Sequence, residues 1–176
     1  MVTEQYIWVD DGSGLVPKVK NMPEDKYTEE EAHKRFAVNS FNLVWDLLDK
    51  EQRTKEEEDQ MVNAAHASRF HWGEIGTPLE FERGEWQISR VYSVLNRPEE
   101  ARYHAERCLD ICEKNQFGDF DIAFAYEAMA RSAAVAGKVE EAEKYVKLAK
   151  EASEKIEEEG NKNYFLSELK TVPGYK

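Results

Sequence analysis

The sequence is poor in proline, glycine and cysteine. Its 176 residues include five prolines, nine glycines and two cysteines, which excludes a collagen-like, low-complexity or disulfide-stapled chain. No proline falls between Pro23 and Pro78 or between Pro98 and Pro173. Because an interior proline costs a helix about 3 kcal/mol, both of these spans are free to be helical. Two cysteines in a chain of this length also favour a reducing compartment, so we expect a cytoplasmic protein.

Long apolar runs and an excess of basic charge are lacking as well. No run of 18 apolar residues is present, so no membrane span is predicted, and the first residues lack the basic start and apolar stretch of a signal peptide. The 36 acidic residues against 24 basic ones give a formal net charge of -12. This excess argues against nucleic acid and against a membrane surface as the main partner, since duplex DNA and anionic lipids attract cations.

Motifs for specific chemistry are absent too. The sequence contains no P-loop, dinucleotide fingerprint, Gly-x-Ser-x-Gly or His-Glu-x-x-His motif, so no catalytic residue, cofactor or metal ligand is predicted. His104, Cys108 and Cys112 do share one stripe of a predicted helix. Such a stripe can supply soft metal ligands, but we expect the two cysteines to serve as small buried residues of the core.

Residues 1–27 differ from the rest of the chain. Residues 6–9 are β-prone, and residues 10–14 have the composition of a turn. We expect an N-terminal arm or a small hairpin, with a loosely attached tail as the alternative. Three apolar residues favour docking of this segment onto the helices: Tyr6, Ile7 and Trp8.

From residue 28 onward, signals for the start of a helix recur. Thr28, Thr54 and Thr77 each precede a glutamate by three residues, which is the pattern of a capping box. Pro78 and Pro98 stand where the first residue of a helix is expected. Short connections make consecutive helices antiparallel neighbours. The predicted helices cover residues 28–50, 54–75, 78–95, 98–115, 119–136, 139–159 and 162–170.

Two segments align with each other at an offset of 41 residues. Residues 85–109 and 126–150 each read as a helix, a tight turn, Glu-Glu-Ala and a second helix. Ala101 and Ala142 hold equivalent positions, where a small residue lets two helix backbones approach closely. Since an isolated helix pair cannot bury its apolar face, we expect several pairs to stack and share one core.

This repeat resembles the tetratricopeptide family in a longer-period form. The residues that carry the resemblance lie in the first helix, the turn and the second helix of each copy: Tyr92, Asn96, Ala101, Cys108, Leu109, Gly137, Ala142, Leu148 and Ala149. Residues 29–75 fit as a divergent pair. The resemblance implies an all-α domain over residues 28–176, built from about three stacked antiparallel pairs plus a capping helix in a right-handed superhelix.

In the resembled family, the first helix of each pair lines a concave groove. Asparagine amides can clamp an extended peptide backbone there, and arginine holds carboxylates. The resemblance therefore implies a non-catalytic scaffold that binds a protein or peptide, with a merely solvated polar face as the alternative. The residues that it places on the groove are Asn39, Asn42, Arg83, Trp86, Arg90, Glu127 and Arg131.

The middle of the chain supports a second hypothesis. From Arg53 to Arg131 the sequence has eight arginines and only two lysines, and arginine is preferred where planar or stacked contacts matter. A small-molecule pocket or an uncharacterised enzyme is the functional interpretation, whereas arginine–glutamate pairing and hydrogen-bonded histidines between helices are the structural one. A homo-oligomer built through an exposed repeat end is a third option. The residues of the alternative pocket are His66, Arg69, His71, Trp72, Glu85 and His104.

Overall fold

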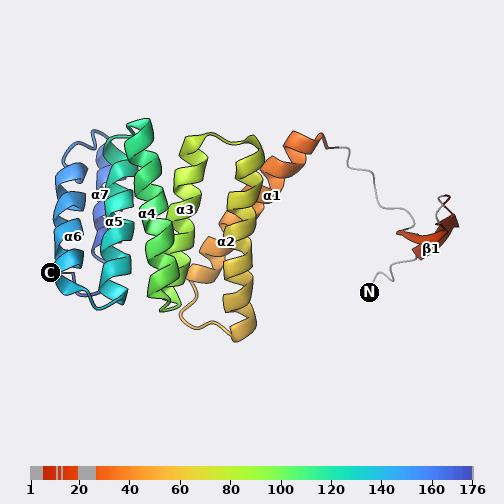
Figure 1. Ribbon diagram of the computed structural model, residues 1–176, viewed down its shortest axis with the longest axis horizontal. Coiled ribbons are helices and arrows are strands. Elements are labelled where there is room, and N and C mark those ends of the chain that lie inside the picture. Colours follow the sequence, from red (N-terminus) through yellow and green to blue (C-terminus); the bar gives the residue numbers. More distant parts are fainter. Residues whose placement is uncertain (1–5, 11, 13, 20–26, 176) are drawn as a thin grey trace.

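The computed structural model describes residues 6–10, 12, 14–19 and 27–175. Within them the chain is α-helical from residue 29 on, and Figure 1 shows the helices following one another in a row, from α1 and α2 at one end to α6 and α7 at the other. Their bounds are α1 (Glu29–Leu48), α2 (Lys55–Ile75), α3 (Pro78–Val94), α4 (Pro98–Asn115), α5 (Asp119–Val135), α6 (Val139–Ser153) and α7 (Glu159–Leu169).

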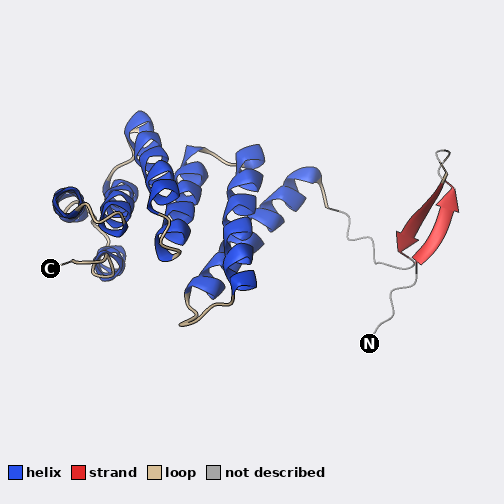
Figure 2. Cartoon of the chain, turned by 60° about the horizontal axis from the view of Figure 1, so that its bottom comes forward, coloured by secondary structure: helices blue, strands red, loops and turns tan. Residues whose placement is uncertain are grey.

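A short hairpin precedes the helices. Strands β1 (Tyr6–Asp10) and β2 (Leu15–Val19) pair antiparallel, and the register joins Tyr6 to Val19 and Asp10 to Leu15. Figure 2 shows both strands in red. The expected docking of Tyr6, Ile7 and Trp8 lies outside the residues whose side chains are described.

The three predicted capping boxes are present. Thr28, Thr54 and Thr77 each accept a hydrogen bond from a backbone amide in the first turn, and the glutamate three residues later accepts one from the threonine amide. Each box satisfies two amides that a helix start leaves without an intrahelical partner. These local bonds explain why α1, α2 and α3 begin where the sequence predicted.

The prediction was wrong at the end of the sixth helix. α6 ends at Ser153 rather than at residue 159, and Gly160, which was predicted to end it, lies in the first turn of α7. The connection turns early and buries Ile156. Glu158 then caps α7 by accepting hydrogen bonds from the amides of Gly160 and Asn161, at the helix end that favours negative charge.

The turns of the α3–α4 and α5–α6 pairs are built alike. Asn96 and Gly137, which lie 41 residues apart in the sequence, both adopt left-handed backbone angles, with φ of 55° and 71°. In both turns the amide after this residue donates to the carbonyl five residues earlier, at 2.9 Å. This is the Schellman closure of a helix end, and its repetition shows that the two copies share one backbone plan.

α7 continues the row of first helices. α3, α5 and α7 begin at Pro78, Asp119 and Glu159, which are nearly equal steps along the chain. α5 contacts both α3 and α7, and the rings of Phe124 and Phe165 meet edge to face at 5.0 Å. The predicted capping helix therefore takes the place of the first helix of a further copy. We call the side formed by α1, α3, α5 and α7 the odd-helix face.

The core consists of two clusters of buried side chains that meet at α3. Met61 and Ile88 belong to the cluster between α1, α2 and α3, and Trp86 and Phe165 to the cluster that extends from α3 to α7. The structure thus confirms the all-α class, while the handedness of a superhelix stays a prediction. None of the described helices combines the length and the apolar character that crossing a membrane requires.

Gly84 tests the close approach of α3 to α2. A Cβ atom at this position would lie 2.7 Å from the Cδ of Arg69, whose guanidinium is held by Glu85. We expect Gly84→Ala to lower the free energy of unfolding by about 1–2 kcal/mol despite the better helix propensity of alanine. Gly73→Ala on α2, where the nearest atom is 3.4 Å away, should raise it by about 0.5–1 kcal/mol. Urea denaturation measures both, and equal stabilisation by the two variants would contradict the close approach.

Candidate functional site

Four of the seven predicted groove residues form one buried network of charges. Glu127 on α5 is 1% exposed, and its carboxylate accepts hydrogen bonds from the Trp86 indole at 2.9 Å and from Arg131 Nε at 2.6 Å. Arg90 Nη1 lies 3.5 Å from the same carboxylate. Burial, followed by the charge of Arg131, lowers the pKa of Arg90. The network therefore ties α3 to α5 inside the protein.

The C-terminal helix and the residues after it cover this network. Arg131 donates to the carbonyl of Thr171 at 3.0 Å and to its hydroxyl at 2.7 Å. Arg90 Nη2 lies 3.1 Å from the Glu168 carboxylate on α7. The side chains of this network therefore bind other parts of the same chain. The sequence had predicted that they bind a partner on the same face. They are Trp86, Arg90, Glu127 and Arg131.

The other three predicted groove residues lie nearer the start of the helix row. Asn39 and Asn42 are exposed on α1. Arg83 on α3 is half-exposed and pairs with Asp121 of α5 at 3.0 Å. A cavity of about 220 Å³, which we call the α1–α3 notch, lies between α1, α2 and α3. Its lining residues are Val38, Phe41, Trp72, Glu80, Arg83 and Gly84.

Four of the six residues of the alternative pocket meet on the other side of α3. Glu85 is 2% exposed and accepts a hydrogen bond from Arg69 Nε of α2 at 3.1 Å. His104 Nδ1 and Arg107 Nε, both of α4, lie 2.7 Å and 3.1 Å from the same carboxylate. His66 of α2 faces His104 edge to face, with ring centroids 5.4 Å apart. Sequence reasoning missed Arg107, although it follows His104 by three residues on the same helix.

These side chains line a shallow opening of about 330 Å³ between α2 and α4, which we call the α2–α4 cleft. Phe70 and Tyr103 stand in its walls and are 60% and 56% exposed. Burial acts to raise the pKa of Glu85, but the hydrogen bond to His104 and the charge of Arg107 outweigh it and lower that pKa. Burial, helped by the charge of His104, lowers the pKa of His66.

His71 and Trp72 do not reach this cleft. The Nδ1 atoms of His71 and His33 lie 3.2 Å apart, which places His71 against α1. Trp72 lines the α1–α3 notch. Five residues along a helix rotate a side chain by about 140°, so His66 and His71 face different neighbours. The structure thus divides the predicted alternative pocket among three places, namely the α2–α4 cleft, the contact of His71 with His33 on α1, and the α1–α3 notch.

The two cysteines lie in the core beside a buried glutamate. Cys108 and Cys112 are fully buried and free of disulfides, and the Cys108 thiol donates to Glu82 Oε1 at 3.1 Å. Burial raises the pKa of Glu82 to about 8, and its Oε2 has no hydrogen-bond partner within the described part of the chain. Among the same residues, no set of three or more histidine, cysteine, aspartate and glutamate side chains is placed to hold a metal ion.

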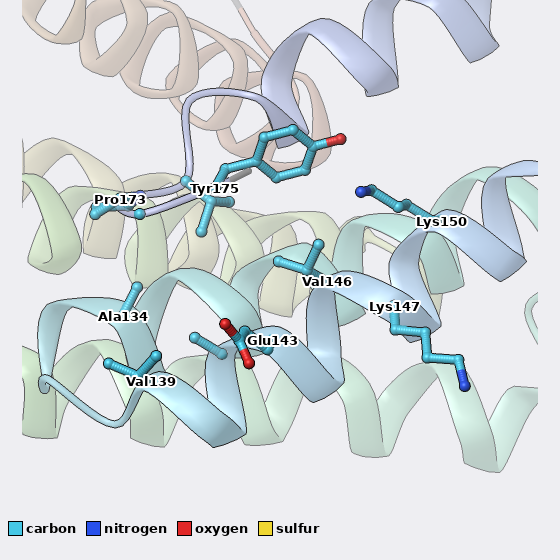
Figure 3. Close-up of a pocket in the computed structure, with 11 residues that line it drawn as sticks. Ala134, Val139, Glu143, Val146, Lys147, Lys150, Pro173 and Tyr175 are labelled. Atoms are coloured by element: carbon cyan, nitrogen blue, oxygen red, sulfur yellow. The ribbon is translucent and has the colours of Figure 1, made fainter.

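A further cavity, of about 470 Å³, lies between α6 and the chain after α7. Figure 3 shows Pro173 and Tyr175 on one side of it and Val139 and Val146 of α6 on the other. None of the predicted site residues lines this cavity. It lies at the end of the helix row, where association of two copies was considered, and that association stays a prediction.

Comparison with known proteins gives no match. No family model fits the chain, and no curated protein and no solved structure is significantly similar to it. The resemblance to tetratricopeptide repeats therefore stays a prediction.

Glu82 predicts an unusual dependence of stability on pH. Its carboxyl is protonated in the folded protein up to pH about 8, whereas in the unfolded chain it ionises near its ordinary pKa of about 4.5. Glu82 therefore costs no stability below pH 4.5, and its cost grows as the pH rises toward 8, by up to about 1.4 kcal/mol per pH unit. We expect Glu82→Gln to match the parent near pH 4 and to exceed its stability increasingly up to pH 8 in urea denaturation.

Glu80→Gln is the matched control, because it should have the opposite sign. A hydrogen bond from the Thr77 hydroxyl lowers the pKa of Glu80, so this carboxylate stabilises the folded state at neutral pH and stops doing so as the pH falls through its folded pKa. A Glu82→Gln variant whose stability difference from the parent does not change between pH 4 and pH 8 would contradict the assignment.

Substitution of Glu127 shows how much the buried network stabilises the fold compared with an exposed ion pair. Glu127→Gln leaves the buried Arg131 without its anion, so we expect it to lower the free energy of unfolding by about 3 kcal/mol or more. Asp121→Asn removes the partner of the half-exposed Arg83 and should cost about 1 kcal/mol or less. Thermal unfolding compares the two, and amide exchange in α7 should speed up in Glu127→Gln alone. Equal effects would mean that the network does not hold α7.

Proposed function

We propose that this chain is a non-catalytic helical-repeat scaffold of tetratricopeptide type that binds a segment of another protein at the α1–α3 notch. One observation carries the proposal. Asn39 and Asn42 are exposed and Arg83 is half-exposed at this end of the odd-helix face, whereas the other predicted groove residues are bound within the chain. The exposed part of the predicted groove is therefore the part beside the notch.

The chemistry of the notch suits a short segment with an apolar anchor. Val38 is 38% exposed, and Phe41 and Trp72 supply aromatic walls, so the cavity of about 220 Å³ takes one apolar side chain. Central apolar anchors of this kind dominate the affinity of protein interfaces. The exposed Asn42 amide can donate to and accept from a peptide backbone.

Charge selects the residue next to the anchor. Arg83 holds Asp121 through Nε and Nη2, both bonded to one carboxylate oxygen, at 3.1 Å and 3.0 Å. A guanidinium has five donors, so Arg83 can also donate hydrogen bonds to a second carboxylate, one that belongs to a partner. Glu80 also lines the notch, but the Thr77 amide and hydroxyl already hold its carboxylate. The proposed ligand is a protein segment that presents an apolar side chain with an acidic residue close to Arg83.

A cytoplasmic location is part of the proposal. Both cysteines of the chain are free thiols and are buried, which suits a compartment that keeps thiols reduced. A second candidate function, the binding of a small ligand in the α2–α4 cleft, is favoured by the meeting of four predicted pocket residues there.

A peptide-display library panned on the full chain tests the scaffold proposal. We expect the enriched peptides to carry an apolar residue next to an acidic one, and to bind Val38→Asp at least about 10-fold more weakly than the parent, because a charge in the notch repels an apolar anchor. Asn42→Ala should weaken binding several-fold. Fluorescence anisotropy of labelled peptides measures these affinities.

Two exposed positions away from the notch supply matched controls. Val139 on α6 and Asn63 on α2 are exposed, so Val139→Asp and Asn63→Ala make the same chemical changes elsewhere. Both should leave the affinity of the peptides unchanged. A panning that enriches no peptide, or peptides that Val139→Asp weakens as much as Val38→Asp, would refute the notch as the binding site.

A further inference from the structure

The α2–α4 cleft gathers positive charge in an acidic protein. The chain carries a net charge of -12, yet the cleft is lined by two arginines and two histidines against a single carboxylate. Arg69 and Arg107 alone outweigh Glu85 by one unit of charge. Positive charges in a confined opening attract a negative ion from solution. The cleft therefore favours an anion even though the protein as a whole repels one.

Glu85 holds the cationic side chains in place from below. Its Oε1 atom lies 3.1 Å from the Nε atoms of both Arg69 and Arg107, and its Oε2 atom lies 2.7 Å from His104 Nδ1. A single buried carboxylate therefore fixes three donors from two different helices. Side chains fixed in this way lose little conformational entropy when a ligand binds.

The buried anion and the cations above it differ in their exposure to solvent. The side chain of Glu85 is 3% exposed, whereas those of Arg69 and Arg107 are 20% and 45% exposed. Each arginine reaches Glu85 through Nε, at 3.1 Å, and the Arg69 guanidinium also lies over the Phe81 ring, with its carbon 4.5 Å from the ring centre. His104 turns Nδ1 toward Glu85, so the Nε2 atom of the neutral ring is a hydrogen-bond acceptor and the anion-binding donors of the cleft are those of the arginines. A ligand that enters the cleft therefore meets the more exposed arginines before the buried carboxylate.

Aromatic side chains stand on both walls of the cleft. Phe70 from α2 is 60% exposed and Tyr103 from α4 is 56% exposed. The Arg107 guanidinium carbon lies 5.6 Å from the centre of the Tyr103 ring, so charge and ring surface adjoin. Exposed aromatic residues next to arginine are typical of recognition sites, and their faces suit a flat ring.

We propose that the α2–α4 cleft binds an organic anion, in which a carboxylate or phosphate group meets Arg69 and Arg107. The anionic group is attached to a flat ring, and the ring packs against Phe70 and Tyr103. The site lies on α2, α3 and α4, away from Asn42 and Val38. A negative result at the notch would therefore leave this proposal untouched, and the reverse also holds.

Isothermal titration calorimetry of the full chain at pH 7 and low salt tests this proposal. The probes are phenyl phosphate and benzoate, with inorganic phosphate and acetate as anions without a ring and benzamide as a ring without charge. We expect at least one aryl anion to bind saturably and about 10-fold more tightly than the anion without a ring, and benzamide to show no binding. The stronger of the two aryl anions identifies the anionic group as phosphate or carboxylate.

Arg107→Gln and Arg102→Gln form the matched pair of variants. Both residues lie on α4, but Arg102 pairs with Glu106 and Glu141 and does not line the cleft. Arg107→Gln should weaken the aryl anion about 10-fold or more, since it removes a charge-assisted contact, and Arg102→Gln should leave the affinity unchanged. The proposal is overturned if neither aryl anion binds, or if Arg102→Gln weakens binding as much as Arg107→Gln; thermal unfolding of each variant shows that it is folded.

Discussion

The structure depends on the polar side chains that α3 carries into the core. α3 lies between neighbours on several sides, so residues such as Glu85, Gln87 and Ser89 are almost completely buried. A buried polar group costs about 1–3 kcal/mol unless it finds a hydrogen-bond partner. Gln87 donates to the Phe41 carbonyl of α1, and Ser89 donates to the Ala101 carbonyl of α4. Glu85 binds side chains of α2 and α4, and the Trp86 indole reaches Glu127 of α5. These hydrogen bonds fix four helices around one.

Both candidate sites follow from this arrangement, because successive residues of α3 are rotated by about 100° around the helix axis and so meet different neighbouring helices. Glu85 faces the even-numbered helices and becomes the floor of the α2–α4 cleft. Trp86 faces α5 and enters the network on the odd-helix face. Arg83 lies at the edge of the same face beside the α1–α3 notch. A single helix therefore contributes side chains to both proposed sites, and the hydrogen bonds that stabilise the fold also hold those side chains in position.

Local signals in the sequence predicted much of the fold. They predicted less of the candidate site, because the site depends on contacts between residues far apart in the sequence. Capping boxes such as Thr54 with Glu57 act within one helix turn, so the sequence shows them directly. The equivalence of Asn96 and Gly137 followed from the 41-residue repeat. In contrast, the contact of Arg90 with Thr171 joins residues 81 positions apart, and no local pattern predicts that α7 covers the network. The end of α6 was missed for a similar reason, since burial of Ile156 depends on the helices around it.

The preference for arginine in the middle of the chain has a physical explanation in the ion pairs. Arg69, Arg83 and Arg131 each hold a carboxylate of their own or a neighbouring helix, and a planar guanidinium can do so while bonding other groups at the same time. Lysines such as Lys147 lie on exposed helix faces, where one flexible charge is enough. This bears out the structural interpretation of the arginines, namely pairing between helices. Arg107 differs from the others in that it joins a carboxylate that two other side chains already hold, and about half of it, as of Arg83, stays exposed. A partly exposed arginine that shares its carboxylate partner with other side chains can also bind a ligand. This is the physical basis for proposing that an anion binds in the α2–α4 cleft.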